Sequence, residues 1–183
     1  MKATGIVRRI DDLGRVVVPK EIRRTLRIRE GDPLEIFTDR EGEIILKKYS
    51  PIGELGPFAQ HYAESIAQTT GYMVCITDKD QIIAGSGGAK KSYLGKAISK
   101  QLEKLIDERE SITATKDDKK FVKIVEDDNN EYNSEAICPI ISEGDVIGAV
   151  VIFNKDANSK MGEVEQKLAQ SAAGFLGRQM EQS

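Results

Sequence analysis

The chain has 183 residues, of which 39% are apolar and 31% are charged. This composition is typical of a folded globular protein, and it argues against an intrinsically disordered chain. No apolar run reaches the roughly 20 residues that cross a bilayer, and the first residues contain no signal-peptide core. We therefore expect a cytoplasmic protein with no membrane partner.

Charge is distributed unevenly along the chain. Residues 1–29 contain nine Lys and Arg but only three Asp and Glu, a net charge of +6. The remaining residues carry −9, which gives the total of −3. A polyanion would be attracted to the first segment and repelled by the rest. The N-terminal segment is therefore the candidate nucleic-acid-binding region.

In the first 50 residues, short β-branched runs alternate with turn residues, and one helix-like run begins at Pro19. Gly14 can take the positive φ that a tight turn requires, and Pro19 is tolerated at the first position of a helix. Gly31 and Pro33 stop that helix. The pattern predicts strands at 5–10, 15–18, 34–38 and 43–48, and a helix from Pro19 to about Ile28.

A unit of about 50 residues buries too little surface to be comfortably stable alone. We therefore expect two copies to share one core. Proline and glycine pairs then interrupt the pattern and predict a linker. The expected organisation is a DNA-binding and dimerisation domain at 1–50, a linker at 51–56 and a regulatory or oligomerisation domain at 57–183.

The second domain shows three amphipathic patterns separated by β-like runs, which indicates an α+β fold with an antiparallel sheet. The last helix is expected to place Met161, Val164, Leu168, Ala172 and Phe175 on one side. Helices are predicted at 58–69, 91–109 and 160–180, and strands at 72–77, 81–84, 121–126, 135–141 and 145–153.

Few side chains in the sequence suit catalysis or metal binding. Cys75 and Cys138 lie in separate apolar runs, where a free cysteine packs as a small hydrophobe. His61 is the only histidine and has no Cys or His close to it in sequence. The acidic pairs lie in polar turns without a nearby base. We therefore expect no catalytic residues, no metal and no cofactor.

The helix that begins at Pro19 has one cationic face. At roughly 100° per residue its basic side chains fall within an arc of about 100°, with apolar residues on the far side. A solvated surface face remains an alternative. Arg8, Arg9 and Arg15 in the preceding segment favour a polyanion, because converging guanidinium groups repel one another. The helical cations are Lys20, Arg23, Arg24 and Arg27.

Residues 12–26 read Asp-Leu-Gly-Arg-Val-Val-Val-Pro-Lys-Glu-Ile-Arg-Arg-Thr-Leu. With the flanking positions 4–48, they resemble the AbrB-type swapped-hairpin family of transition-state regulators. The resemblance implies that two chains exchange β-hairpins to form one barrel-like dimer whose arginines enter the DNA major groove. The positions that match the family's DNA-contacting arginines are Arg8, Arg15, Arg23 and Arg24, and the helix adds Lys20 and Arg27 as candidate contacts.

The whole chain is similar to sporulation regulators that join such a domain to a GAF-type sensory domain, and Phe153-Asn154-Lys155 fits a GAF strand end. This resemblance implies control of sporulation genes, as activator, repressor or both. A possible small-molecule pocket lies between the sheet and the loop 85–92, where Ser86, Lys90, Lys91 and Ser92 could meet a polar or anionic group.

Oligomerisation beyond a dimer is left open by the sequence. The apolar faces of the helices at 58–69 and 160–180 could pair between subunits and give a homotetramer, or could cover their own sheet. Three other functions also remain open: an antitoxin, an architectural protein that coats DNA in the nucleoid without sensing a ligand, and a small-molecule-modifying enzyme.

Overall fold

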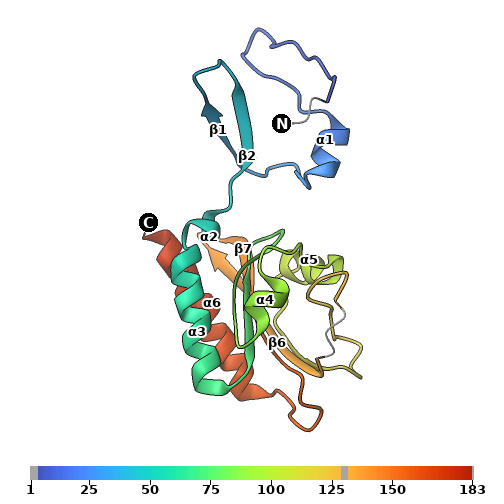
Figure 1. Ribbon diagram of the computed structural model, residues 1–183, viewed down its shortest axis with the longest axis vertical. Coiled ribbons are helices and arrows are strands. Elements are labelled where there is room, and N and C mark those ends of the chain that lie inside the picture. The colour runs from blue at the N-terminus through green and yellow to red at the C-terminus, as the bar shows by residue number, and fades with distance from the viewer. Residues whose placement is uncertain (1–3, 129–131, 183) are drawn as a thin grey trace. The chain divides into compact units, whose positions relative to one another are not determined.

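A computed structural model describes residues 4–128 and 132–182. The chain divides into two units, residues 1–49 and 50–183. Each is described by itself below (Figure 1). In the described residues, no helix is long and apolar enough to span a membrane.

The N-terminal unit contains one short helix and one hairpin. The helix is α1 (Lys20–Thr25), and the hairpin joins β1 (Leu34–Thr38) to β2 (Ile44–Lys48). The two strands are antiparallel, with Ile36 opposite Leu46. The strand predictions at 34–38 and 43–48 are thus confirmed.

The strands predicted at 5–10 and 15–18 are wrong for this chain, because the described residues of both segments carry no strand. The turn between them does form. Asp11 N donates to Arg15 O at 3.0 Å and Gly14 N donates to Asp11 O at 3.0 Å, with Gly14 at φ +74°. β-branched residues favour extended backbone, but a strand also requires a hydrogen-bonded neighbour. That neighbour is missing from the described residues of this chain.

The helix predicted to reach Ile28 ends at Thr25. Arg27 has φ +53°, in the left-handed region, and Ile28 N donates to Arg23 O at 2.7 Å. The chain therefore turns away from the helix axis before Arg27. The expected arc of four helical cations is reduced to Lys20, Arg23 and Arg24.

The C-terminal unit is a five-stranded antiparallel sheet with helices on both faces (Figure 1). Helices α3 and α6 lie side by side on one face, and α4 and α5 cover the other. The strand order is β4-β3-β7-β6-β5. The elements are α2 (Pro51–Glu54), α3 (Gly56–Thr70), β3 (Met73–Thr77), β4 (Ile82–Ser86), α4 (Ala89–Tyr93), α5 (Lys100–Asp107), β5 (Ile112–Thr115), β6 (Ser134–Ser142), β7 (Asp145–Asn154) and α6 (Glu163–Glu181).

The segment 51–56, predicted as a linker, is helical instead. Ser50 caps α2 by accepting from Gly53 N at 3.2 Å, and Pro51 occupies the first turn, where its missing N–H costs nothing. Ile52 is completely buried in the core between the sheet, α3 and α6. The prolines and glycines here start helices and do not form an extended tether.

The helix predicted at 91–109 is also wrong as a single element. It is divided into α4 and α5 by residues 94–99, where Gly95 has φ +76° and Ile98 forms an isolated bridge with Val125. That bridge is the only β pairing of the predicted strand 121–126 in the described chain. Strand β5 was not predicted, because its four residues are too short to show a period.

Small residues bring α6 close to the sheet. Its buried side is Ala169, Ala172, Ala173, Leu176 and Gly177, whereas the predicted stripe included Val164, which is 74% exposed. A Cβ added to Gly177 would collide with the carbonyl oxygen of Ile141 on β6. At Gly177 the backbone of α6 therefore lies directly against the backbone of β6.

One carboxyl group is buried in the sheet. Glu135 on β6 is completely inaccessible, and burial raises its pKa to about 8, partly offset by the hydrogen bond from Val122 N at 2.7 Å. Its second oxygen, Oε2, has no hydrogen-bond partner among the described residues. An uncompensated buried carboxylate is costly, so the neutral acid is favoured at neutral pH.

Replacing Gly177 by Ala is expected to destabilise the C-terminal unit by about 1–3 kcal/mol, because α6 must move off β6. Gly174→Ala on the same helix is the matched control, since a Cβ there meets nothing within 4 Å. That control should stabilise the unit by up to about 1 kcal/mol. Urea unfolding of both variants measures the effect, and equal responses would refute the close approach.

Glu135 makes the stability of the C-terminal unit depend on pH. Because its folded pKa of about 8 lies above the ordinary value of 4.5, the stabilising contribution is present below pH 4.5 and is lost as pH rises through 8. Glu135→Gln keeps the shape and removes the titration. Over this range wild type should lose a few kcal/mol relative to the variant, about 1.4 kcal/mol per pKa unit. Parallel curves of unfolding free energy against pH would contradict the assignment.

Candidate nucleic-acid interface

Asp11 organises the turn that presents Arg15. Its carboxylate accepts from Leu13 N at 3.0 Å, Arg15 N at 2.8 Å and Arg15 Nε at 2.8 Å. The backbone bond from Arg15, followed by the bond from its guanidinium, lowers the pKa of Asp11. Arg15 is thereby held in one geometry at the tip of the turn, while most of its side chain stays exposed. The sequence analysis did not identify this positioning role of Asp11.

Helix α1 supplies the other candidate contacts. Pro19 is buried at its N-cap, so the helix begins at a fixed point, and Lys20 and Arg24 are exposed while Arg23 is half-buried. In the described part of the chain, the side chains of Arg8, Lys20, Arg23 and Arg24 form no ion pair. These cations are available to a polyanion.

The segment that follows α1 is tied to β2 by Lys48. Its ammonium donates to Arg27 O at 2.7 Å and lies 3.4 Å from Asp32 Oδ2. Asp32 also accepts from Arg29 N at 2.8 Å. Arg27 is half-buried in this joint, so its backbone anchors the helix to the hairpin.

The N-terminal unit has almost no interior of its own. Among its described residues only Pro19 is buried. Large apolar side chains are exposed from every segment, and Val7, for example, is 88% exposed. Contiguous exposed apolar surface marks an interaction site. The exposed members are Ile6, Val7, Ile10, Leu13, Val16, Val17, Leu26, Ile36, Phe37, Ile44 and Leu46.

The residues of the predicted small-molecule pocket lie around the start of α4. Ser86 ends β4 and Ser92 is half-buried, whereas Lys90 and Lys91 are exposed. Gly87 and Gly88 have φ +69° and +92°, which lets the chain reverse tightly between β4 and α4. Their use as a pocket stays a prediction.

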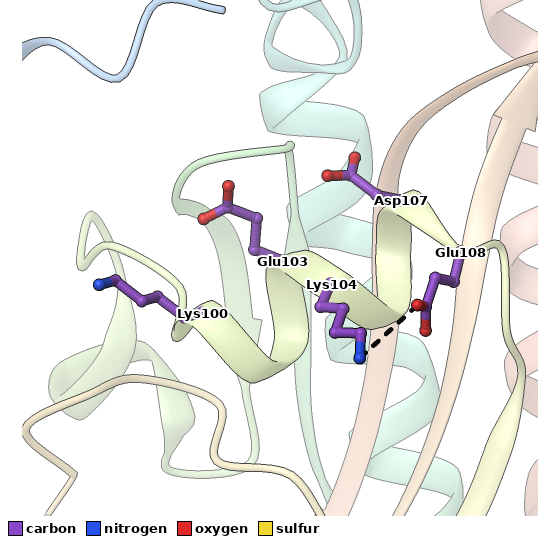
Figure 2. Close-up of a pocket in the computed structure, with 5 residues that line it drawn as sticks. All are labelled: Lys100, Glu103, Lys104, Asp107 and Glu108. Atoms are coloured by element: carbon purple, nitrogen blue, oxygen red, sulfur yellow. Dashed lines mark ion pairs between the residues drawn. The ribbon is translucent and has the colours of Figure 1, made fainter. Parts of the chain in front are cut away.

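A shallow hollow on the outer side of α5 is lined by charged residues only (Figure 2). Figure 2 shows Lys104 paired with Glu108, at 3.7 Å. Glu103 and Asp107 project from the neighbouring turns (Figure 2). Cations and anions are interspersed here and solvent screens them, so the hollow has no affinity for one sign of charge.

Three carboxylates in the hairpin turn between β1 and β2 approach within 4.8 Å of one another, from Asp39, Glu41 and Glu43. Asp39 Oδ1 already accepts from Glu41 N at 3.0 Å and Glu43 N at 2.9 Å. The cluster is explained by the turn that Asp39 closes.

Two family models match the chain. The model described as stage V sporulation protein T C-terminal, transcription factor, matches residues 54–181. The model described as antidote-toxin recognition MazE, bacterial antitoxin, matches residues 7–54.

Individual relatives agree with this division. Stage V sporulation protein T of Bacillus subtilis (strain 168) is 61% identical over 182 residues, covering 100% of both chains. The transition state regulatory protein AbrB of the same organism is 67% identical over 51 residues, 28% of this chain and 52% of AbrB. The GAF domain of an Acinetobacter phosphoenolpyruvate-protein phosphotransferase superposes with TM-score 0.56 at 14% identity, covering 70% of this chain and 82% of that domain.

These matches confirm the expected fold class, an AbrB-like N-terminal domain followed by a GAF-like α+β domain with an antiparallel sheet. The AbrB-type domain implies DNA binding, and the family is one of transcription factors. The chain belongs to the stage V sporulation protein T family of transcription factors.

Proposed function

We propose that this protein regulates sporulation genes in the nucleoid of the cytoplasm by binding double-stranded DNA as a homodimer of its N-terminal units. One observation carries the dimer: a single chain leaves eleven large apolar side chains exposed around one buried proline. Full burial of one such side chain contributes about 1.5–3 kcal/mol. A second copy can supply both the missing strand neighbours and the missing core.

In the dimer each DNA-contacting side chain occurs twice. Arg8 and Arg15 come from the segment before α1, and Arg23 and Arg24 from α1. We assign these four to base and phosphate contacts in the major groove, because a guanidinium can bind guanine or phosphate through two hydrogen bonds. Lys20 and Arg27 supply phosphate contacts at the rim. The two-fold repeat suits two half-sites on a duplex.

The C-terminal unit is proposed to join two DNA-binding dimers into a tetramer and to sense a small molecule. Phe175 of α6 stacks with Phe58 and Tyr62 of α3 at 5.6 and 5.3 Å between ring centroids, and Phe58 stays 39% exposed. An aromatic cluster that is partly open to solvent suits an apolar contact between copies. The loop with Ser86, Lys90, Lys91 and Ser92 is the proposed place for a polar or anionic group of the ligand.

Arg23→Ala and Arg24→Ala should each weaken DNA binding by about 1–3 kcal/mol per contact while leaving the fold intact. Fluorescence anisotropy with promoter DNA over a salt series measures affinity and the number of neutralised phosphates together. Wild type should show a log-log slope of about −4 to −7. Arg40→Ala, in the exposed turn between β1 and β2, removes the same charge and is the control. An Arg24→Ala protein that binds like wild type would overturn the assignment.

Sedimentation velocity of the full chain should show a tetramer. Phe58→Asp places a charge in the proposed contact, and because Asp is favourable near the N-terminus of α3 the helix should persist. The variant should sediment as a dimer. Gln68→Asp, at an exposed position of α3 that has no place in the aromatic cluster, should stay tetrameric. A wild-type dimer would rule out the proposed contact.

A further inference from the structure

The sheet face under α4 and α5 contains buried acidic groups that the proposed DNA binding does not use. Burial, followed by the charge of Glu135, raises the pKa of Tyr132, and burial with Asp128 raises the pKa of Cys75. Tyr93 Oη donates to Asp128 Oδ2 at 2.6 Å. The cluster is Cys75, Tyr93, Asp128, Tyr132 and Glu135.

Glu135 is the unsatisfied member of this cluster. It is completely buried, its Oε1 accepts from Val122 N at 2.7 Å, and its Oε2 has no hydrogen-bond partner in the described residues. No Lys or Arg within that part of the chain forms an ion pair with it. A buried acid of this kind is normally paired, since each unmade hydrogen bond costs free energy.

Aromatic rings surround this carboxyl group. Phe153 lies opposite Glu135 in the β6–β7 register, and its ring meets Tyr93 at 5.4 Å and Tyr132 at 5.3 Å between centroids. Phe121 is 5.2 Å from Tyr132. Lys96, the one described cation on a ring of this cluster, is exposed and sits 5.9 Å from the Tyr93 centroid. The interior is therefore rich in π electrons and acidic oxygens.

The segment above Glu135 is held by side chains more than by backbone pairing. Val122 N donates to Glu135 Oε1, and Ile124 N donates to Tyr132 Oη at 2.8 Å. Tyr132 Oη in turn donates to Val122 O at 3.2 Å. The far end of the segment is fixed by the bridge between Ile98 and Val125. Lys123 N also donates to Gln101 Oε1 at 3.0 Å, and Ser99 N donates to Ile124 O at 2.9 Å. Residues 121–124 are thus held without a β ladder, and a ligand would reach Glu135 by opening these few hydrogen bonds.

We propose that this face binds a small organic ammonium ion beneath residues 121–124, with the cationic group on Glu135 Oε2 beside the rings of Tyr132 and Phe153. A cation would stabilise the ionised form of Glu135, and aromatic rings attract a cation to their faces. A divalent metal would need several more oxygen ligands than the single open carboxyl oxygen provides. The inference rests on the proposed sensing role of the C-terminal unit and is independent of the DNA contacts.

Binding would be linked to one proton. The neutral Glu135 acid releases its proton to solvent as the ammonium ion docks, so the bound pair is carboxylate and ammonium. Among the titratable and charged groups on this face, Tyr132 is the one whose pKa the charge of Glu135 raises, and Asp128 acts on Tyr132 and Cys75. Lys96 lies over the Tyr93 ring, and β5 places Ala114, which does not titrate, opposite Glu135. As the pH rises towards 8, the affinity for the ammonium ion should increase about tenfold per pH unit, because Glu135 releases its proton more easily.

The test is a titration of the full chain with n-butylammonium chloride, with n-butanol and sodium chloride as controls. A pH-stat at pH 6.5 should record release of up to one proton per chain with the amine and none with either control. The melting temperature of the protein should rise with n-butylammonium and not with either control, and the rise should be larger at pH 7.5 than at pH 6. Equal responses to n-butanol or to sodium chloride would overturn the proposal without any variant.

Glu135→Gln keeps an oxygen for Val122 N and removes the charge. It should weaken n-butylammonium binding at least tenfold at pH 7.5 and abolish proton release, whereas Glu110→Gln, an exposed acid, should behave like wild type. A Gln variant that binds as wild type does would contradict the assignment. Promoter affinity measured with and without the amine separates the claims: binding without any effect on DNA supports the site and refutes the sensing role.

Discussion

The N-terminal unit cannot bury its own apolar side chains, and this constraint governs how the protein presents its cations. Val7, Val17 and Ile36 are each more than two-thirds exposed in a single chain, and the segments before and after the first turn have no strand partner. A domain this small buries little surface, and residues 1–49 contain no cysteine that could form a disulfide. Burying those side chains against a second copy would fix the segment that carries Arg8 and Arg15 relative to α1.

The C-terminal unit meets the same requirement by itself. Its sheet is covered on both faces, and α6 approaches β6 so closely that Gly177 has no room for a side chain. Only Tyr49 and Ser50 separate β2 from α2, and Ile52 of α2 is already part of the core.

Local signals in the sequence were sufficient where a single residue type determines the geometry. The sequence predicts Gly14 in its turn, Pro19 at the start of α1 and the two strands β1 and β2. The predictions failed where a long-range partner decides the outcome. Residues 5–10 have strand composition without a strand neighbour, and the stripe through Val164 was displaced because Ala and Gly define the buried side of α6.

The candidate site shows the same division. The charge asymmetry identifies the N-terminal unit as the DNA-binding region, and the family pattern selects four of its arginines. The placement of Arg27 outside α1 and the hydrogen bonds between Asp11 and Arg15 depend on backbone geometry that the sequence does not reveal. Glu135 could not be recognised from sequence, because its neighbours in space, Tyr132 excepted, are distant along the chain. The one sequence feature that points to Glu135 is its position as the acid in a nine-residue strand of otherwise apolar and small residues.

The central claim is that the N-terminal unit is completed by a second copy. Thermal unfolding of the full chain, followed by amide hydrogen exchange at residues 5–18 over a wide range of protein concentration, tests it directly. Folding coupled to association predicts that protection of these amides and the midpoint of their transition rise with concentration, while the C-terminal sheet unfolds separately. Protection of residues 5–18 that is strong and independent of concentration, in a protein shown to be monomeric, would contradict the account.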